Sequence, residues 1–416
     1  ATYSNSETDQ IPPHEYKNGF CVNCSAPQDD FAPVEDGFYM LSTPAHLWWF
    51  CRQVSEFGHI DWNAKMTADL NMSAFCEQFV PAGSSTHPYR GHFDGQGHQI
   101  SNLVVTSDVK FFGLFGQLGT GAVIENLLLD ESCILYGTDC VALVGGTDQV
   151  SGEVILRNLG NKGNVYASGQ QAAGIFGGNS GSKTALVIEN CFSTGVIEGS
   201  TQSAALVAWA GSNGIKVSNC WSCSEVVGND FENMYLVRHA NATLTNCYCV
   251  YGTQFPSMPF DDIQSGALCY KLNGDQTSVA WYQNLDNGMV DDCPVPFANG
   301  HAQVFPKGKI FCDGSVDETT VVYSNNNQTI IPDHEFEDGF CQVCGTEDTG
   351  YTGFLPNIIN PDYNSNGNNW EGDALSIANG VAQQSKKAFD SYQLVTDLQP
   401  GVYKLRVQGF SRAAAL

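Results

Sequence analysis

Two short hydrophobic patterns alternate along residues 100–253. The first is an apolar residue, any residue, asparagine, and then an apolar residue or cysteine; its asparagines are Asn102, Asn126, Asn158, Asn190, Asn219 and Asn246. The second is a tetrapeptide with an apolar centre that lies between them, at residues 113–116, 142–145, 174–177, 205–208 and 235–238. Both series recur about every thirty residues and stay in phase, which indicates a repeat array.

Short apolar strands separated by glycine turns at this period predict a parallel β-helix, in which each coil advances by one strand spacing of about 4.8 Å. Apolar side chains of successive coils then stack in the core, and the six asparagines form a structural ladder of amide hydrogen bonds. Cys191, Cys220 and Cys247 share one column. They are interpreted as small buried apolar residues, with a disulfide between adjacent coils as the alternative that the spacing permits.

The open strand edges of such an array require covers. A helix is predicted over residues 44–57, with Thr43 as its N-cap, and a second over residues 260–272, followed by the bulky Trp281 and Tyr282. The run at residues 93–98 is interpreted as a glycine turn that enters the first coil.

The chain also carries a longer-range repeat with an offset of 320 residues, in which a histidine is followed by a CxxC pair. Its candidate metal ligands are His14, Cys21 and Cys24 in the first copy and Cys312, His334, Cys341 and Cys344 in the second. The counterpart of Cys312 would precede Ala1. The two alternatives are a structural zinc site and a disulfide or packed thiols, and an oxidising compartment favours the latter.

The composition disfavours some classes of function and some cellular locations. Lysine and arginine total 18 and aspartate and glutamate 44, for a net charge of −26, which disfavours nucleic acid as a partner. Sixteen cysteines favour an oxidising, extracellular or cell-surface location, with any export signal already removed. No apolar run reaches the roughly 18 residues that a membrane-spanning helix needs.

Several motifs occur in an order that resembles the GLUG-repeat proteins exported by Bacteroidota. They are YRGHFDGQGHQISNL at residues 89–103, the Gly-Leu-Phe-Gly repeats, and SGALCYKLNG at residues 265–274. The resemblance covers roughly residues 36 to 312, and it implies a secreted or surface β-helix, often one module of a larger protein, with no known reaction. Ala208 and Arg238 replace the final glycine of the repeat, so the last coils are expected to be irregular.

Residues 351–416 resemble the opening half of the carbohydrate-binding β-sandwiches appended to many surface proteins of the same bacteria. Tyr403, Leu405 and Val407 alternate with polar residues, as in a half-buried strand. Trp370 and Tyr392 are the candidate residues for stacking on a glycan. Too few residues follow Gly350 to complete such a domain of about 100 residues, so the segment is expected to be incomplete.

The predicted fold is therefore mainly β: a parallel β-helix with short helical caps, flanked by small cysteine-containing connectors. The predicted division is a first connector at 1–34, the capped β-helix at 35–253, a helical and aromatic C-terminal cap at 254–311, a second connector at 312–350, and an incomplete β-sandwich-like segment at 351–416.

No catalytic constellation is found in the sequence. Glu125, Arg157 and Glu189 occupy one column, but this is interpreted as a solvated charge ladder between strands, not as a glycosidase carboxylate pair. No complete calcium motif is present. We expect a non-catalytic surface scaffold or adhesin that associates with copies of itself, in a filament, or with surface glycans or proteins. The alternative is a glycan-binding accessory region of a larger carbohydrate-active enzyme; a β-helix lyase or glycoside hydrolase is least favoured.

Overall fold

The structure is a computed structural model that describes residues 13–350 and four short strands beyond them. Its gaps are residues 149, 180–183, 210–214, 229–235, 239–241, 252–257, 275, 287–288, 309–310, 315–320, 327–330, 338, 347 and 349. The chain divides into two compact units, the first comprising residues 1–310 with 316–330 and the second residues 311–315 with 331–416.

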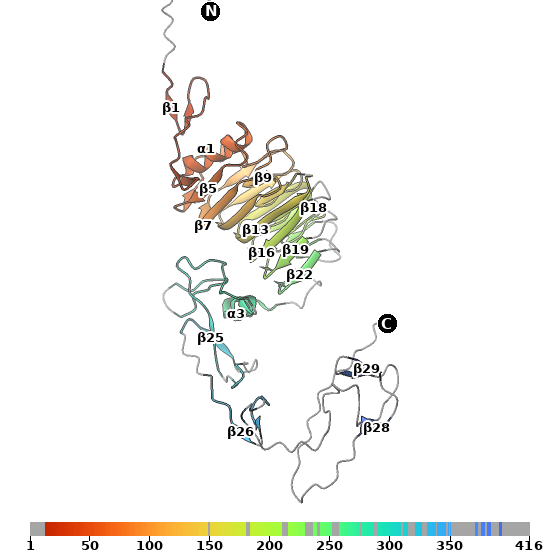
Figure 1. Cartoon of the computed structure of the whole chain (residues 1–416). Helices are drawn as coiled ribbons and strands as arrows, with labels where there is room; N and C mark the ends of the chain where they lie inside the picture. The colour runs from red at the N-terminus through yellow and green to blue at the C-terminus, as the bar shows by residue number, and fades with distance from the viewer. Residues whose placement is uncertain are drawn as a thin grey trace, which may run out of the picture. The chain divides into compact units, whose positions relative to one another are not determined.

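The body of the first unit is a parallel β-helix, as predicted (Figure 1). Its largest sheet contains β7 (His92–Ser101), β10 (Val123–Leu129), β13 (Gly152–Asn161), β16 (Thr184–Glu189), β19 (Ile215–Ser218) and β22 (Ala242–Thr245). Shorter strands extend its rows: β6 (Leu70–Asn71), β17 (Phe192–Ser193), β20 (Trp221–Ser222) and β23 (Tyr248–Cys249). Before β7 the sheet continues through β5 (Asn63–Met66), β4 (Phe38–Leu41) and β3 (Val34–Glu35).

Two further parallel sheets complete each coil. The second contains β8 (Val104–Thr106), β11 (Ile134–Gly137), β14 (Asn164–Gln170), β18 (Ile197–Thr201) and β21 (Val226–Val227). The third contains β9 (Phe115–Leu118), β12 (Val144–Thr147) and β15 (Phe176–Asn179). Strands β7, β8 and β9 follow one another along the chain but lie in different sheets, so the chain turns through all three sheets in each coil.

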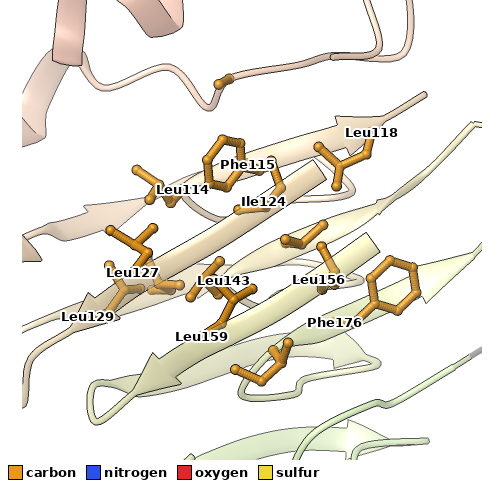
Figure 2. Packing of buried hydrophobic residues seen from close by; sticks show 14 of the residues in the cluster. Leu114, Phe115, Leu118, Ile124, Leu127, Leu129, Leu143, Leu156, Leu159 and Phe176 are labelled. Carbon is orange, nitrogen blue, oxygen red and sulfur yellow. The ribbon is translucent and has the colours of Figure 1, made fainter. Parts of the chain in front are cut away.

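Apolar side chains inside the coils stack in rows, which Figure 2 shows for the middle coils. Ile124 pairs with Leu156, and Leu156 pairs with Ile188 on the next coil; all three are fully buried. Burying a side chain of this size contributes about 1.5–3 kcal/mol. The tetrapeptide series forms a second row, in which Phe115, Val144 and Phe176 are partners across coils. The two interleaved patterns of the sequence are therefore the two rows of one core.

The asparagine of each repeat lies at a backbone corner. All six have a positive φ, between 50° and 56°. Asparagine tolerates this left-handed region better than β-branched or bulky residues do. Backbone geometry is thus one reason for asparagine in the pattern, in addition to its side-chain hydrogen bonds.

The helix expected before the coils is present as α1 (Pro44–Ser55), and Thr43 Oγ1 accepts a 3.2 Å hydrogen bond from the His46 amide. The ring of Phe50 contacts those of Tyr89 and Phe93. Helix α1 therefore packs over the apolar interior of the first coil. A 3₁₀ turn, η1 (Cys76–Gln78), follows β6.

The single helix predicted over residues 260–272 is wrong: it is two short helices, α2 (Phe260–Gln264) and α3 (Ala267–Asn273). Gly266 separates them with a φ of +89°, and a side chain there would also collide with Leu285. A left-handed residue cannot continue an α-helix.

The segment that follows α3 does not cover the end of the coils, as a C-terminal cap would, but lies along their side. Its Trp281 packs in one buried cluster with Leu128, Phe192 and Trp221, which project outward from β10, β17 and β20. The rings of Phe192 and Trp221 stack with their centroids 5.3 Å apart, and Trp281 meets Phe192 edge-on. A hairpin of β24 (Phe305–Lys307) and β25 (Val322–Ser324) follows.

Each connector contains one small antiparallel hairpin. The first pairs β1 (Tyr16–Lys17) with β2 (Phe20–Cys21), and the second pairs β26 (Phe336–Glu337) with β27 (Phe340–Cys341). Further on, β28 (Glu371–Gly372) pairs with β31 (Ser391–Tyr392), and β29 (Ser376–Ala378) with β30 (Val381–Gln383). The β-sandwich at residues 351–416 stays a prediction. Among the described residues, no helix combines the length and the apolar character needed to cross a membrane.

Candidate functional site

A ladder of asparagine amides runs along the largest sheet. Asn158 Nδ2 donates to Asn126 Oδ1 at 2.8 Å, and Asn190 Nδ2 donates to Asn158 Oδ1 at 3.1 Å. Near the last coil, Asn246 Nδ2 donates to Asn219 Oδ1 at 2.9 Å. Between these two runs the ladder is interrupted, since the buried Asn190 Oδ1 has no hydrogen-bond partner among the described residues. The amides donate in one direction, toward the N-terminal coils.

The predicted place of Asn102 in this ladder is wrong. Asn126 Nδ2 donates instead to Asp94 Oδ1, at 2.9 Å, so a carboxylate ends the row. Residues 93–98, predicted as a turn, belong to strand β7, where the register with β10 shifts at a β-bulge. The bulge, with Gln96 and Gly97 at positive φ, displaces the rest of β7 along the sheet. Ile100 pairs with Leu129, so Asn102 lies opposite position 131, five residues past the ladder position (131 − 126 = 5), at the corner that leads to β8.

A second row of polar side chains lies beside the ladder. Glu125 is in register with Arg157, and Arg157 with Glu189. The carboxylate of Glu125 bonds Arg157 Nε, and its other oxygen lies 2.5 Å from His92 Nε2. The hydrogen bond with Glu125 raises the pKa of the Arg157 guanidinium above its ordinary value. The interpretation as a solvated ladder fails for Glu125, which is only 7% exposed.

Both rows form one wall of an open groove of about 1090 Å³. The opposite wall is the segment after α3, chiefly residues 276–280 with Tyr282, and residues 296–299. The long wall of the groove is polar and presents the amides and the Glu125, Arg157 and Glu189 side chains at successive coils. The second wall is mixed, with polar residues at 276–278 and apolar residues at 279–280 and 296–298.

Both ends of the second wall, the segment after α3, are fixed to the coils by hydrogen bonds. Asn246 Nδ2 donates to the carbonyls of Lys271 and Leu272, at 3.3 and 3.0 Å, and so satisfies carbonyl groups at the end of α3. At the other end, Asn299 Nδ2 donates to the carbonyl of Gln96 at 2.5 Å. The segment after α3 therefore spans the coils from the last ladder position back to the bulge in β7.

The cysteine column lies inside the coils, away from the groove. Cys220 is fully buried, and its Sγ accepts a 3.2 Å hydrogen bond from the Cys191 amide. Burial raises the pKa of the Cys220 thiol well above its ordinary value. All sixteen cysteines are free thiols in the structure. Buried thiols of this kind pack as small apolar groups and are inert.

The second connector brings together all four of its candidate ligands. The ligand atoms of Cys312, His334, Cys341 and Cys344 all lie within 4.8 Å of one another. Cys312 Sγ is 3.2 Å from each of Cys341 Sγ and Cys344 Sγ, and Cys344 Sγ is 3.4 Å from His334 Nδ1. All four belong to the second compact unit.

The first connector brings its three candidates together in the same way. His14, Cys21 and Cys24 also lie within 4.8 Å of one another, with Cys24 Sγ 3.4 Å from His14 Nδ1. A hydrogen bond with His14 lowers the pKa of the Cys21 thiol to about 6. In the second connector, burial raises the pKa of the Cys341 thiol, but hydrogen bonds from its neighbours outweigh it and lower the pKa to about 5.

The two candidate glycan-stacking residues cannot be assigned to a site within the described part of the chain. Trp370 lies outside the described residues, and Tyr392 is described only as a backbone position of β31, paired with Glu371. Sequence reasoning did not identify His92 and Asp94 as the partners of the Glu125 and Asn126 side chains. The spacing carried a signal for Asp94, because it precedes Asn126 by 32 residues, the step that separates Asn126 from Asn158.

No protein-family model matches the chain. A stretch of 124 residues is 35% identical to halomucin of Haloquadratum walsbyi, which amounts to 27% of this chain and 1% of halomucin. A stretch of 112 residues is 26% identical to an Evansella cellulosilytica protein named "Putative Gly-rich membrane protein", covering 26% of this chain and 12% of that protein. The chain thus spans a small part of both relatives.

One solved structure is similar over most of its length. It is titled as that of "a putative immunoglobulin A1 protease from Bacteroides ovatus", and it covers 63% of this chain and 93% of its own. The sequence identity is 15% and the TM-score 0.44. A likeness at this level concerns the fold and carries no argument about activity.

Proposed function

We propose that this chain is an exported, non-catalytic β-helix protein of the GLUG-repeat type that acts as a surface adhesin, and that its groove binds an extended glycan. The observation that carries the proposal is the open groove of about 1090 Å³, whose wall presents an asparagine on successive coils beside a row of charged side chains. Hydrogen-bonding groups repeated at the strand spacing of about 4.8 Å suit a polymer with repeated hydroxyl groups.

The chemistry of the wall supports a sugar ligand. The Arg157 side chain is 44% exposed and Glu189 is half-buried, and both carry planar groups that adjacent hydroxyl groups of a sugar ring can engage in pairs. Tyr282 adds an aromatic ring to the opposite wall. Concave sites with a few fixed polar groups are where small ligands and polymers ordinarily bind.

The negative charge of the chain and of the groove wall disfavours acidic glycans. The chain carries a net charge of −26, and the groove wall has two glutamates for one arginine. An acidic polysaccharide would be repelled at long range and at the wall. The proposal is therefore for a neutral or amine-bearing glycan.

The pairing of the carboxylates supports the non-catalytic part of the proposal. Glu125 is held by both His92 and Arg157, and the register places Arg157 between Glu125 and Glu189. Hydrolysis of a glycosidic bond needs two carboxyl groups with substrate and water between them. Here a guanidinium takes that position.

The test is binding of the full chain to a glycan array, followed by calorimetry with the glycan that gives the strongest signal. Ser278→Trp fills the groove from an exposed position on its wall. Thr106→Trp adds the same ring to an exposed position of β8, in another sheet, and is the matched control. We expect Ser278→Trp to weaken binding at least about tenfold and Thr106→Trp to leave it unchanged.

Two results would contradict the groove proposal: no glycan is bound, or both tryptophan variants weaken binding equally. Self-association of the coils into a filament stays a prediction, and light scattering over a range of concentrations tests it. A catalytic domain elsewhere in the full-length protein would instead favour the role of an accessory region for a carbohydrate-active enzyme.

A further inference from the structure

The second connector contains the densest cluster of potential metal ligands among the described residues, and it shares no residue with the groove. We propose that Cys312, His334, Cys341 and Cys344 bind one structural zinc ion in a tetrahedral Cys₃His site. This inference is independent of glycan binding, because it rests on other residues.

The distances fit a shared ion better than a disulfide. With Zn–S bonds of about 2.3 Å, tetrahedral geometry places neighbouring ligand atoms about 3.8 Å apart. The observed separations are 3.2 Å for two sulfur pairs and 3.4 Å for a sulfur and the imidazole nitrogen. A disulfide joins only two sulfurs, at about 2.05 Å, and would leave the third thiol and the histidine unused. Cys312 is equally close to both partners, as a ligand of one central ion would be.

The backbone holds the CxxC pair in the same turn in both connectors. The Cys341 amide donates to the carbonyl of Thr346, and the Gly345 amide donates to that of Cys341. In the first connector the Cys21 amide donates to Ala26, and Ser25 donates to Cys21. The donor and acceptor offsets are identical, so the turn is a built feature of this sequence motif and not an accident of one copy.

The imidazole ring is also oriented in both copies. His334 stacks on Phe336 with ring centroids 5.1 Å apart, and His14 stacks on Tyr16 at 5.6 Å. In each case Nδ1 faces the second cysteine of the CxxC pair. The Thr346 hydroxyl lies 3.1 Å from Cys344 Sγ and completes the surroundings of that ligand.

A zinc ion would also supply stability that the second connector otherwise lacks. Its hairpin consists of two strands of two residues each, and an isolated hairpin of this kind is marginal in water. The first connector has an additional anchor, because the buried Phe20 packs edge-on against Trp48 of α1. Small units without a core usually need a metal or a disulfide.

The experiment measures zinc in the purified, reduced full chain by mass spectrometry and its affinity by competition with a chromophoric chelator. Cobalt(II), added alone to metal-free protein, reports the ligand set through its thiolate charge-transfer and tetrahedral d–d absorption. We expect one tightly bound zinc per chain. Cys312→Ser should lower its affinity by about 100-fold or more, since even a second-shell loss costs about 10–100-fold.

The first connector provides the internal control. Cys21→Ser removes a ligand from its three-residue cluster and should leave the tight zinc in place. Cys223→Ser, a cysteine outside both clusters, should change nothing. The proposal is overturned if the reduced wild-type chain binds no zinc, if Cys312→Ser retains the tight zinc, or if peptide mapping finds Cys312 in a disulfide in the freshly isolated protein. The zinc content and the peptide map of the wild-type chain remain informative even where a variant connector is unfolded.

Discussion

The coils and the second connector both use very short strands, but their surroundings differ. Strands β17 and β20 have two residues each, as do β26 and β27. In the coils the strand before and the strand after continue the same row, and the Phe192 ring stacks on Trp221 of the next coil. In the connector the hairpin pairs only with itself, and four potential ligands converge beside it. Short strands are thus stabilised by repetition in the coils, whereas in the connector we propose that an ion bound by the four ligands does so.

The largest effect on the coils is expected from the core rows. Leu156 is fully buried between Ile124 and Ile188, so Leu156→Ala leaves a cavity that costs about 2–5 kcal/mol of unfolding free energy. Urea unfolding followed by circular dichroism measures it. Val104→Ala, at a strand position of β8 that is 49% exposed, is the control and should cost less than about 0.5 kcal/mol. Equal losses for the two variants would show that the rows are not the source of coil stability.

The asparagine ladder should contribute less than the core. Asn158→Ala removes one donated and one accepted hydrogen bond and places alanine at a φ of 53°, for a cost of about 2–3 kcal/mol. Asn102→Ala meets the same left-handed backbone, at 55°, outside the ladder, and should cost about 1 kcal/mol. The difference between the two variants isolates the ladder. If Asn102→Ala is as destabilising as Asn158→Ala, backbone geometry alone accounts for the pattern.

The contrast between Asn102 and Asn158 also shows what sequence can and cannot reveal. Period and apolar spacing suffice for the β-helix, because every coil obeys the same geometry and the signal accumulates. The local motif around Asn102 is identical in type to the others, yet the register of β7 with β10 places it past the ladder position, at another corner. In the sequence only the length of the step sets Asn102 apart: 126 − 102 = 24 is shorter than the following steps of 32, 32, 29 and 27.

The groove was harder to predict than the ligand clusters, for another reason. The wall of the groove opposite the ladder comes from residues 274–299, and its tether links Asn299 to Gln96 across a separation of 203 residues. No periodic pattern encodes such a contact. The four ligands of the second connector could be named from the sequence because three are local, and a tetrahedral site needs a fourth, for which Cys312 was the candidate.

Removal of zinc should separate the two regions. Treating the reduced chain with a strong chelator should leave the unfolding free energy of the coils, measured in urea, unchanged within about 0.5 kcal/mol. None of the described ligands belongs to a coil. Hydrogen exchange should accelerate at the amides of Gln342 and Gly345, which bond within the connector. Exchange that is the same with and without chelator would mean that the connector does not depend on metal. A fall in the coil midpoint would contradict the independence of the two regions.

The smallest perturbation is chemical labelling of thiols, because the protein is unmodified until the labelling reaction that is measured. Cys24 is exposed in the first connector, whereas Cys220 is fully buried in the coils and burial raises its pKa. In reduced, metal-free protein, iodoacetamide should modify Cys24 quickly and Cys220 only when the coils open. Peptide mapping over time distinguishes the two sites, with Cys24→Ser confirming the assignment of the fast reaction.

Combining this labelling with Leu156→Ala makes the comparison quantitative. If Cys220 reacts through coil opening, its rate should rise about tenfold for every 1.4 kcal/mol that the substitution removes, because the open population grows by that factor. The Cys24 rate should not change, since Leu156 does not contact the first connector. Acceleration at both sites would place the connector and the coils in one cooperative unit. Acceleration at neither would mean that Cys220 is reached by a local motion, so that the last coils open without the core row at Leu156.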